Sequence, residues 1–589
     1  MVWRRKHWRR ALFWRERVRI NEEALHLILA GGIGVLAGLV NLLFFGFHQL
    51  LEMLLLGGMG DVVEVAKQLP TWYRVAAPAI GGLVAGLILF FGLRLLGNPG
   101  LSNLLEVVVA GDGRLSIRSA LVNGLSSLVS ISTGASIGRE GVITQMSATL
   151  ASKSGQWMKW PPYRLRLMVA CGAAAGISAA YNAPLAGALF ASLLVLGNFS
   201  MNLFAPLVVA AVVAAVFSRN FFGIGPWYDV PEFEFTRLGQ LPLFVVLGAV
   251  AGALGAGFLK LLQVSERWWN RLAVPLYVRL GLAGLLVGVI GLQYPEVWGN
   301  GNGAINRVLR EDLTLTFILG LFIAKLIATT ATVGSGTVGG VMTPTLFLGA
   351  AIGSVFDQSL HLLGWDVSLR PATFALAGMA AMLAATTHSP LLAMTLAFEL
   401  SLNYSLMPPL MLASVVATLV ARRLHPESIY SEPLRRKGLE WERESQRAGT
   451  ATEKTVGDVM REPVTPLRET TSFQEIAHRF LGSSNNYLPV VDAERKLIGV
   501  VALQDLKEHL NAGSELAGVI ALDVMRPPPP CLTPNQHLIE ALPVLLASRL
   551  EHVPVVNDAN QGRLVGAVIR GEVLSLFREA LASRAVGRL

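Results

Sequence analysis

The residues best suited to chemistry lie in a glycine-rich segment, residues 134–142, with the sequence GASIGREGV. An apolar run from Ile143 predicts that a helix begins here. The free N–H groups at a helix start and the positive end of its dipole form an anion site, which glycines let the ion approach. The carboxylate of Glu140 can occupy the same site. We interpret Glu140 as a tethered competitor of a passing anion or, when protonated, as a proton carrier; helix capping beside Arg139 is the alternative.

Two further segments have the same character. Residues 334–344 read GSGTVGGVMTP, in which glycines precede a proline that suits a first helical turn. Residues 98–106 read NPGLSNLLE, in which Ser102 offers a hydroxyl donor and a helix N-cap. Three glycine-punctuated helix starts inside an apolar block would otherwise point unpaired donors into lipid. We therefore expect these helix starts to surround an anion.

The composition requires lipid around these segments. Of the 589 residues, 53 % are hydrophobic and only 15 % are charged, whereas soluble domains carry about 25 % charge. Much of the net charge of +9 lies in a basic arm, residues 1–22, whose tryptophans suit a headgroup zone and whose charge favours a cytoplasmic N-terminus. This placement argues against a nucleic-acid partner. Cys171 and Cys531 lie in different parts of the chain, so no disulfide scaffold or CxxC metal site is available.

The apolar block, residues 23–432, contains an internal repeat. The sequence around NAPL at 182–185 recurs 206 residues later around HSPL, and the halves run over about 25–224 and 240–430. Many of the apolar stretches are interrupted by glycine or proline. Interrupted helices at corresponding positions of two halves indicate a transport site near the bilayer midplane.

The polar tail is a second repeat that follows a charged linker at 433–452. VGDVM recurs as ALDVM and LPVV recurs as VPVV, both 65 residues later, and each unit reads β–α–β–β–α. The two copies, residues 453–516 and 517–589, resemble a tandem pair of cystathionine-β-synthase (CBS) domains. Nucleotide-binding CBS domains hold the ribose with a threonine and an aspartate, and both threonines are missing here. Asp505 and Glu572 remain as alternative ligands, so we expect adenine nucleotides to bind weakly or not at all.

The membrane block resembles the CLC family of chloride channels and chloride/proton exchangers, in its prokaryotic type with C-terminal CBS domains. GREG at 138–141 is similar to the GREGP motif of that family, GGVMTP at 339–344 to its GxFxP region, and NAPLAG at 182–187 to a third motif. The GSGIP motif is eroded around Ser102, and SIY at 428–430 resembles the last membrane helix. The resemblance implies that Glu140 is the gating glutamate. It also implies the anion-binding residues, which are Ser102, Gly138, Arg139, Glu140, Gly141, Val341, Met342 and Tyr430.

The implied fold is an all-α polytopic membrane domain of two inverted repeats, followed by a cytosolic α/β tandem CBS pair. The implied protein is a homodimer in the cell (inner) membrane, with its N-terminus and CBS domains in the cytoplasm, and it is not an enzyme. It transports chloride and uses neither a cofactor nor a metal.

The residues favour a channel-like transporter gated by voltage or pH. Proton-coupled relatives place a glutamate where this chain has Leu193 and Leu194, so the inner proton carboxylate is absent. A chloride/proton antiporter is the alternative. A CBS-regulated cation transporter or a membrane sensor is less favoured, because Glu106, Glu140 and Glu399 are too scattered to replace the hydration shell of a cation.

Overall fold

The computed structural model divides into two compact units, Met1–Trp441 with Arg588–Leu589, and Glu442–Gly587. Ser102 and most of the basic arm and of the expected linker lie outside the described residues. The described residues are 22–58, 60–97, 104–109, 111–160, 162–197, 201–223, 228, 238–311, 313–365, 371–437, 455–481, 485–506, 518–548, 550–558 and 562–574.

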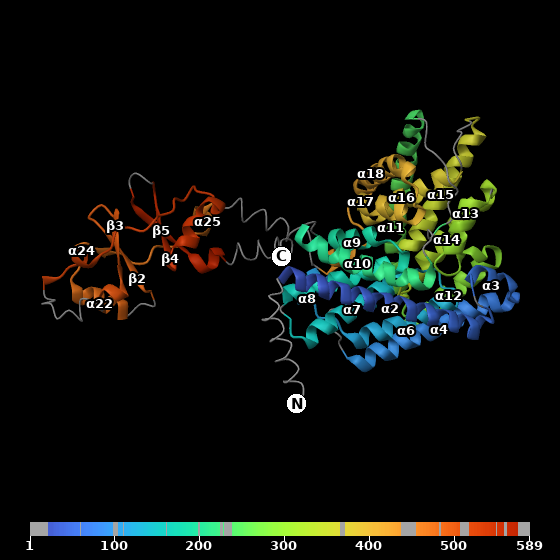
Figure 1. The fold of residues 1–589 in the computed structure, drawn as a ribbon, viewed down its shortest axis with the longest axis horizontal. Helices are drawn as coiled ribbons and strands as arrows, with labels where there is room; N and C mark the ends of the chain where they lie inside the picture. Colours follow the sequence, from blue (N-terminus) through green and yellow to red (C-terminus); the bar gives the residue numbers. More distant parts are fainter. Residues whose placement is uncertain are drawn as a thin grey trace. The chain divides into compact units, whose positions relative to one another are not determined.

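The membrane unit is built of helices (Figure 1). Seven described helical segments are long and apolar enough to cross a membrane, and they include α2, α4, α10, α11, α12, α14 and the segment Tyr404–Leu424. The last described helix of this unit, α19, runs into the first residues of the expected linker. In chain order the elements are α2 (Glu22–Leu56), α3 (Val62–Gln68), α4 (Thr71–Leu96), α5 (Leu104–Val109), α6 (Ile117–Ser132), α7 (Glu140–Trp157), α8 (Pro162–Tyr181), α9 (Pro184–Phe190), the π-helix η1 (Ala191–Val195), α10 (Met201–Phe222), η2 (Leu238–Gln240), α11 (Leu241–Arg271), α12 (Leu276–Gln293), η3 (Pro295–Val297), α13 (Asn302–Arg310), α14 (Leu315–Gly334), α15 (Met342–Leu362), α16 (Pro371–Thr387), α17 (Pro390–Ser401), η4 (Tyr404–Leu406), α18 (Met407–Leu424) and α19 (Ser431–Arg436).

Two apolar stretches are each broken into two helices at the same place of the repeat. The backbone turns at Asn182 between α8 and α9, and at His388 between α16 and α17, with φ of 57° and 55°. Pro184 and Pro390 then begin the next helices, where a proline loses no helical hydrogen bond. The repeated sequence therefore folds twice into the same broken pair.

Helices α4 and α12 are equivalent in the two halves, and they pack directly against each other. A Cβ on Gly86 would lie 2.4 Å from Cα of Tyr277, and a Cβ on Gly288 would lie 2.8 Å from Cα of Val75. Each contact becomes the other when the two halves are exchanged. As residue numbers increase along α4, the residues that they contact in α12 decrease in number, so the two helices are antiparallel. A pseudo-two-fold axis therefore inverts one half relative to the other. The predicted inverted repeats are confirmed.

Helices α8 and α16 are buried and rich in alanine, and the exterior of the unit exposes many apolar side chains. Helix α8 packs on α7, α10 and α2, and α16 packs in the same way on α15, α18 and α11 (Figure 1). On α2, exposed side chains follow one helix face at Leu43, Phe47, Leu50 and Leu54. Such a stripe is stable in a bilayer but not in water.

The described residues of the tail unit form two small sheets. Strands β1, β2 and β3 form the first, in which β1 pairs parallel with β2 and β2 antiparallel with β3; β4 and β5 form an antiparallel pair. Its elements are α21 (Val456–Val459), β1 (Leu467–Arg468), α22 (Phe473–Leu481), β2 (Tyr487–Val491), β3 (Leu497–Ala502), α24 (Ala521–Val524), α25 (Leu538–Ala547), β4 (His552–Val556) and β5 (Leu564–Ile569).

The two copies exchange their leading helices. Val456 of α21 packs in the core of the second copy, beside Leu532 and Leu538. Ala521 and Val524 of α24 pack in the core of the first copy. The copies are therefore intertwined and stabilise each other.

The prediction of one strand in the tail was wrong. The first strand expected in the second copy is reduced to a single bridge between Leu532 and Val555. Four prolines, residues 527–530, precede it. Proline has no N–H to donate to a ladder, so pairing cannot extend towards the N-terminus.

Candidate functional site

The two glycine-rich loops of the membrane unit meet at the pseudo-two-fold axis. Gly138 and Gly340 are equivalent residues of the two halves, and each donates its N–H to the carbonyl oxygen of the other at 2.7 Å. Helix α7 begins at Glu140 directly after the first loop, and α15 begins at Met342 directly after the second. The fold thus brings two helix starts, 202 residues apart in sequence, to one point.

The carboxylate of Glu140 lies on the start of the opposite helix. Its Oε1 accepts the N–H of Thr343 at 3.1 Å, and its Oε2 accepts the hydroxyl of Thr343 at 3.1 Å. Tyr181, at the end of α8, shares a hydrogen bond of 2.8 Å with the same threonine hydroxyl. Glu140 is only 2 % exposed. The carboxyl group of Glu140 therefore already occupies donors that an anion would use.

Glycine is required at two positions around this carboxylate. A Cβ at position 138 would lie 2.1 Å from Oε2 of Glu140, and a Cβ at position 340 would lie 2.3 Å from Oε1. Any other residue would expel the carboxylate from its present place. The repeated glycines thus make room for the side chain of Glu140 itself.

Arg139 and the loop before it are held by one face of α2. The guanidinium of Arg139 lies 5.5 Å from the ring centre of Phe45. One turn further, Nδ1 of His48 hydrogen-bonds to the Ser132 hydroxyl at 2.7 Å, and its Nε2 lies 3.3 Å from the buried Glu52 carboxylate. This packing positions the loop that leads into Glu140.

Tyr430 comes from near the C-terminal end of the membrane unit and lies in the region of Glu140. It is the N-cap residue of α19, lies within electrostatic range of Glu140, and packs edge-on against Phe190 with 5.6 Å between ring centres. The neighbouring Ile429 donates its N–H to the carbonyl of Thr386 at 3.0 Å. Phe190 is followed by η1, which contains Leu193 and Leu194.

The structure brings most of the predicted anion-site residues together. Gly138, Arg139, Glu140 and Gly141 surround the start of α7, and Val341 and Met342 form the N-cap and first residue of α15. Ser102 lies outside the described residues. Sequence reasoning assigned no role to Thr343 or Tyr181, although both are parts of the repeated motifs.

In the tail, both acidic candidates are engaged by arginines of the opposite copy. Asp505 accepts the N–H of Ala502 at 3.1 Å and Nε of Arg526 at 2.9 Å. Glu572 pairs with Arg461 at 2.7 Å. Arg461 and Arg526 are equivalent residues of the tail repeat, so the two ion pairs are related by its pseudo-symmetry.

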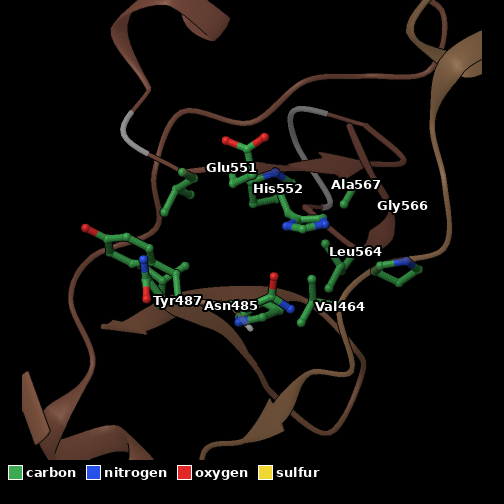
Figure 2. A pocket seen from close by; sticks show the side chains of 14 residues that line it. Val464, Asn485, Tyr487, Glu551, His552, Leu564, Gly566 and Ala567 are labelled. Carbon is green, nitrogen blue, oxygen red and sulfur yellow. The ribbon is translucent and has the colours of Figure 1, made fainter. Parts of the chain in front are cut away.

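A cavity of about 370 Å³ lies between the two copies of the tail. Figure 2 shows Tyr487 and Asn485 on one side of it, with His552 and Glu551 on the other. Among the described residues that line this cavity, none is lysine or arginine. Its size suits a small ligand, but the described part of its lining offers no fixed positive charge to a phosphate.

Two families match the sequence. Residues 81–422 match the voltage gated chloride channel family, and residues 456–512 and 520–579 each match the CBS domain. The chain belongs to the CLC family. It is therefore a chloride transporter with a C-terminal CBS pair, and it is not an enzyme.

Similar CLC proteins cover the membrane unit. A protein of Ralstonia nicotianae named as ClcB-like is 39 % identical over 414 residues, which are 70 % of this chain and 96 % of that protein. The voltage-gated ClC-type chloride channel ClcB of Escherichia coli O9:H4 (strain HS) is 36 % identical over 409 residues, 69 % of this chain and 98 % of ClcB.

Solved CLC structures share the fold. A slow cyanobacterial Cl⁻/H⁺ antiporter is 25 % identical, with a TM-score of 0.63 over 72 % of this chain and all of that one. A CLC-type fluoride/proton antiporter is 23 % identical, with a TM-score of 0.59 over 70 % of this chain and 98 % of that one. The predicted membrane fold is confirmed.

Proposed function

We propose that this CLC protein conducts chloride along a pathway that the Glu140 carboxylate closes. What supports the proposal is the position of that carboxylate on the N–H and hydroxyl of Thr343 at the start of α15. An anion and a carboxylate compete for the same donors. Protonation of Glu140 weakens its hold, so low external pH promotes flux.

The remaining anion-site residues keep their proposed roles. Ser102 and Tyr430 coordinate the central chloride, the backbone N–H groups of Val341 and Met342 complete its shell, and Arg139 adds positive charge beside it. Chloride flux is then saturable, and potassium does not permeate. In reconstituted liposomes, Tyr430→Ala should alter anion selectivity; a potassium-selective current in the wild type would contradict the proposal.

We further propose that chloride moves without stoichiometric proton movement. The support is η1, where Ser192, Leu193 and Leu194 offer no carboxylate, because a proton crossing an apolar region needs an ionisable carrier. The alternative, a chloride/proton antiporter, is favoured by the likeness to the cyanobacterial Cl⁻/H⁺ antiporter.

One liposome experiment separates the two. Chloride efflux is followed with an electrode while the external pH is recorded, in the wild type and in Glu140→Gln. We expect chloride flux without uphill proton movement in both. Uphill proton transport that is driven by a chloride gradient in the wild type and lost in Glu140→Gln would establish the antiporter.

The assembly and orientation follow the family resemblance. We propose a homodimer in the cell membrane, in which each subunit has its own pathway and the CBS pair lies in the cytoplasm. The mass of the purified protein in detergent, corrected for bound detergent, tests the dimer; a monomeric mass would contradict it. Protease accessibility of the tail in right-side-out and inverted vesicles tests the orientation, since only inverted vesicles should expose it.

A further inference from the structure

Helix α19 ends in Arg435 and Arg436, and Lys437 follows as its C-cap residue. Each of these three basic residues pairs with a carboxylate from a different place. Arg435 pairs with Glu427 in the preceding turn at 2.9 Å, and Arg436 pairs with Glu266 of α11 at 2.5 Å. Lys437 pairs with Glu106 of α5 at 2.6 Å. This six-residue helix is too short to be stable alone, so these contacts fix its place.

The pair of Lys437 and Glu106 differs from the other two in its burial. Glu106 is 2 % exposed, whereas the side chain of Lys437 is 57 % exposed. The buried carboxylate of Glu106 therefore depends on a cation that reaches in from the surface. Removing one partner of such a pair leaves an uncompensated buried charge, which is far more costly than losing an exposed pair.

The pair connects two short helices that flank the proposed chloride pathway. Helix α5 follows the segment of Ser102 and packs on η1. Helix α19 begins after Tyr430, whose ring packs on Phe190 immediately before η1. Helix α5 thus contacts η1, and Tyr430 contacts Phe190, the residue before η1. The pair of Glu106 with Lys437 links α5 to the end of α19.

We infer that Glu106 and Lys437 are positioning residues that hold α5 and α19 at the separation chloride binding requires. This inference rests on the proposed roles of Ser102 and Tyr430. We assign neither Glu106 nor Lys437 a contact with the ion. Their loss changes the affinity for chloride, because no other ion pair joins α5 to α19 among the described residues.

Lys437→Met tests the inference by removing the exposed partner of the pair. We expect the chloride KM of liposome flux to rise about tenfold, which is a loss of about 1.4 kcal/mol of binding free energy, with little change in the maximal flux per protein. Lys437→Arg keeps the charge and should stay within about twofold of the wild type. Arg435→Met is the matched control, since it removes an exposed pair from the same helix without touching α5.

The double variant Glu106→Gln/Lys437→Met separates positioning from a change in local charge. If the single variant acts only by leaving a negative charge near the pathway, the double variant regains wild-type affinity and the inference is overturned. We expect it to stay impaired, because the link between α5 and α19 is still broken. Wild-type KM in Lys437→Met, or a loss of folded protein with an unchanged KM, also overturns the inference.

Tyr430→Ala distinguishes failure of the positioning role from failure of the proposed chloride pathway. If Tyr430→Ala alters anion selectivity while Lys437→Met changes nothing, only the positioning role is lost. If Tyr430→Ala leaves selectivity unchanged, the proposed pathway itself is wrong.

Discussion

At the residue scale, the hydrogen bonds from Thr343 make Glu140 the group whose protonation should control flux. A carboxylate that accepts an N–H and a hydroxyl is held by charge-assisted bonds of about 1.5–3 kcal/mol each. We expect the chloride flux of the wild type to rise as the external pH falls, since the protonated side chain holds these donors less strongly. Glu140→Gln should give a high flux at neutral pH. The measurement is chloride efflux from liposomes between pH 5 and pH 8.

A second variant tests the hydrogen bond that the Thr343 hydroxyl donates to Glu140. Thr343→Val removes one of the two bonds to the carboxylate and keeps the backbone N–H. We expect the onset of acid activation to shift towards higher pH, because the carboxylate is held less strongly. A Glu140→Gln protein whose flux keeps the pH dependence of the wild type would show that another group senses pH.

The sequence predicts Glu140 but not its partners. The glycines and the helix start around residue 140 are local signals that a single segment carries. The contact with Thr343 joins residues 203 positions apart, and it depends on the inversion of one half relative to the other. The role of Tyr181 could not be predicted for the same reason. Its motif predicts the end of a helix but not that its hydroxyl contacts Thr343.

At the element scale, close packing of α4 on α12 depends on glycine. A Cβ on Gly284 would lie 2.0 Å from the carbonyl oxygen of Pro78. Alanine is intrinsically better than glycine inside a helix by about 0.5–1 kcal/mol, but a backbone clash of this size forces the helices apart. We expect Gly284→Ala to destabilise the protein by about 1–3 kcal/mol, seen as a lower melting temperature in detergent.

The matched control lies on α11. Nothing lies within 4 Å of a Cβ on Gly257, so Gly257→Ala should leave the melting temperature unchanged or raise it slightly. Equal melting temperatures for the two variants would mean that α4 and α12 are not packed this closely.

Element boundaries were less predictable than the existence of the elements. The apolar stretches and their repeat could be predicted, because hydrophobicity and spacing are properties of the sequence itself. That Asn182 and His388 adopt positive φ, and so break two stretches, depends on how the following helices pack. The first strand of the second CBS copy was predicted from the repeat alone. The prolines at residues 527–530 prevent it from extending.

At the scale of the whole molecule, the two halves of the tail are joined by equivalent ion pairs. Arg526 holds the largely buried Asp505, and Arg461 holds the exposed Glu572. We expect Arg526→Met to destabilise the tail by about 1–3 kcal/mol, because the largely buried carboxylate of Asp505 loses its arginine. Arg461→Met should have almost no effect, since exposed pairs contribute little. Limited proteolysis of the full chain measures both.

The same ion pairs lead to a prediction about ligands of the full chain. An adenine nucleotide needs a carboxylate or hydroxyl for its ribose and positive charge for its phosphates. Here both acidic candidates already bind arginines, the threonines are missing, and the described lining of the tail cavity holds no lysine or arginine. Losing the ribose hydrogen bonds costs about 1–3 kcal/mol where the groups are buried. We therefore expect calorimetry on the detergent-solubilised full chain to detect no ATP or AMP binding at micromolar concentrations. Micromolar binding that Asp505→Ala abolishes would mean that Arg526 releases the carboxylate to the ribose and that the tail is a nucleotide sensor.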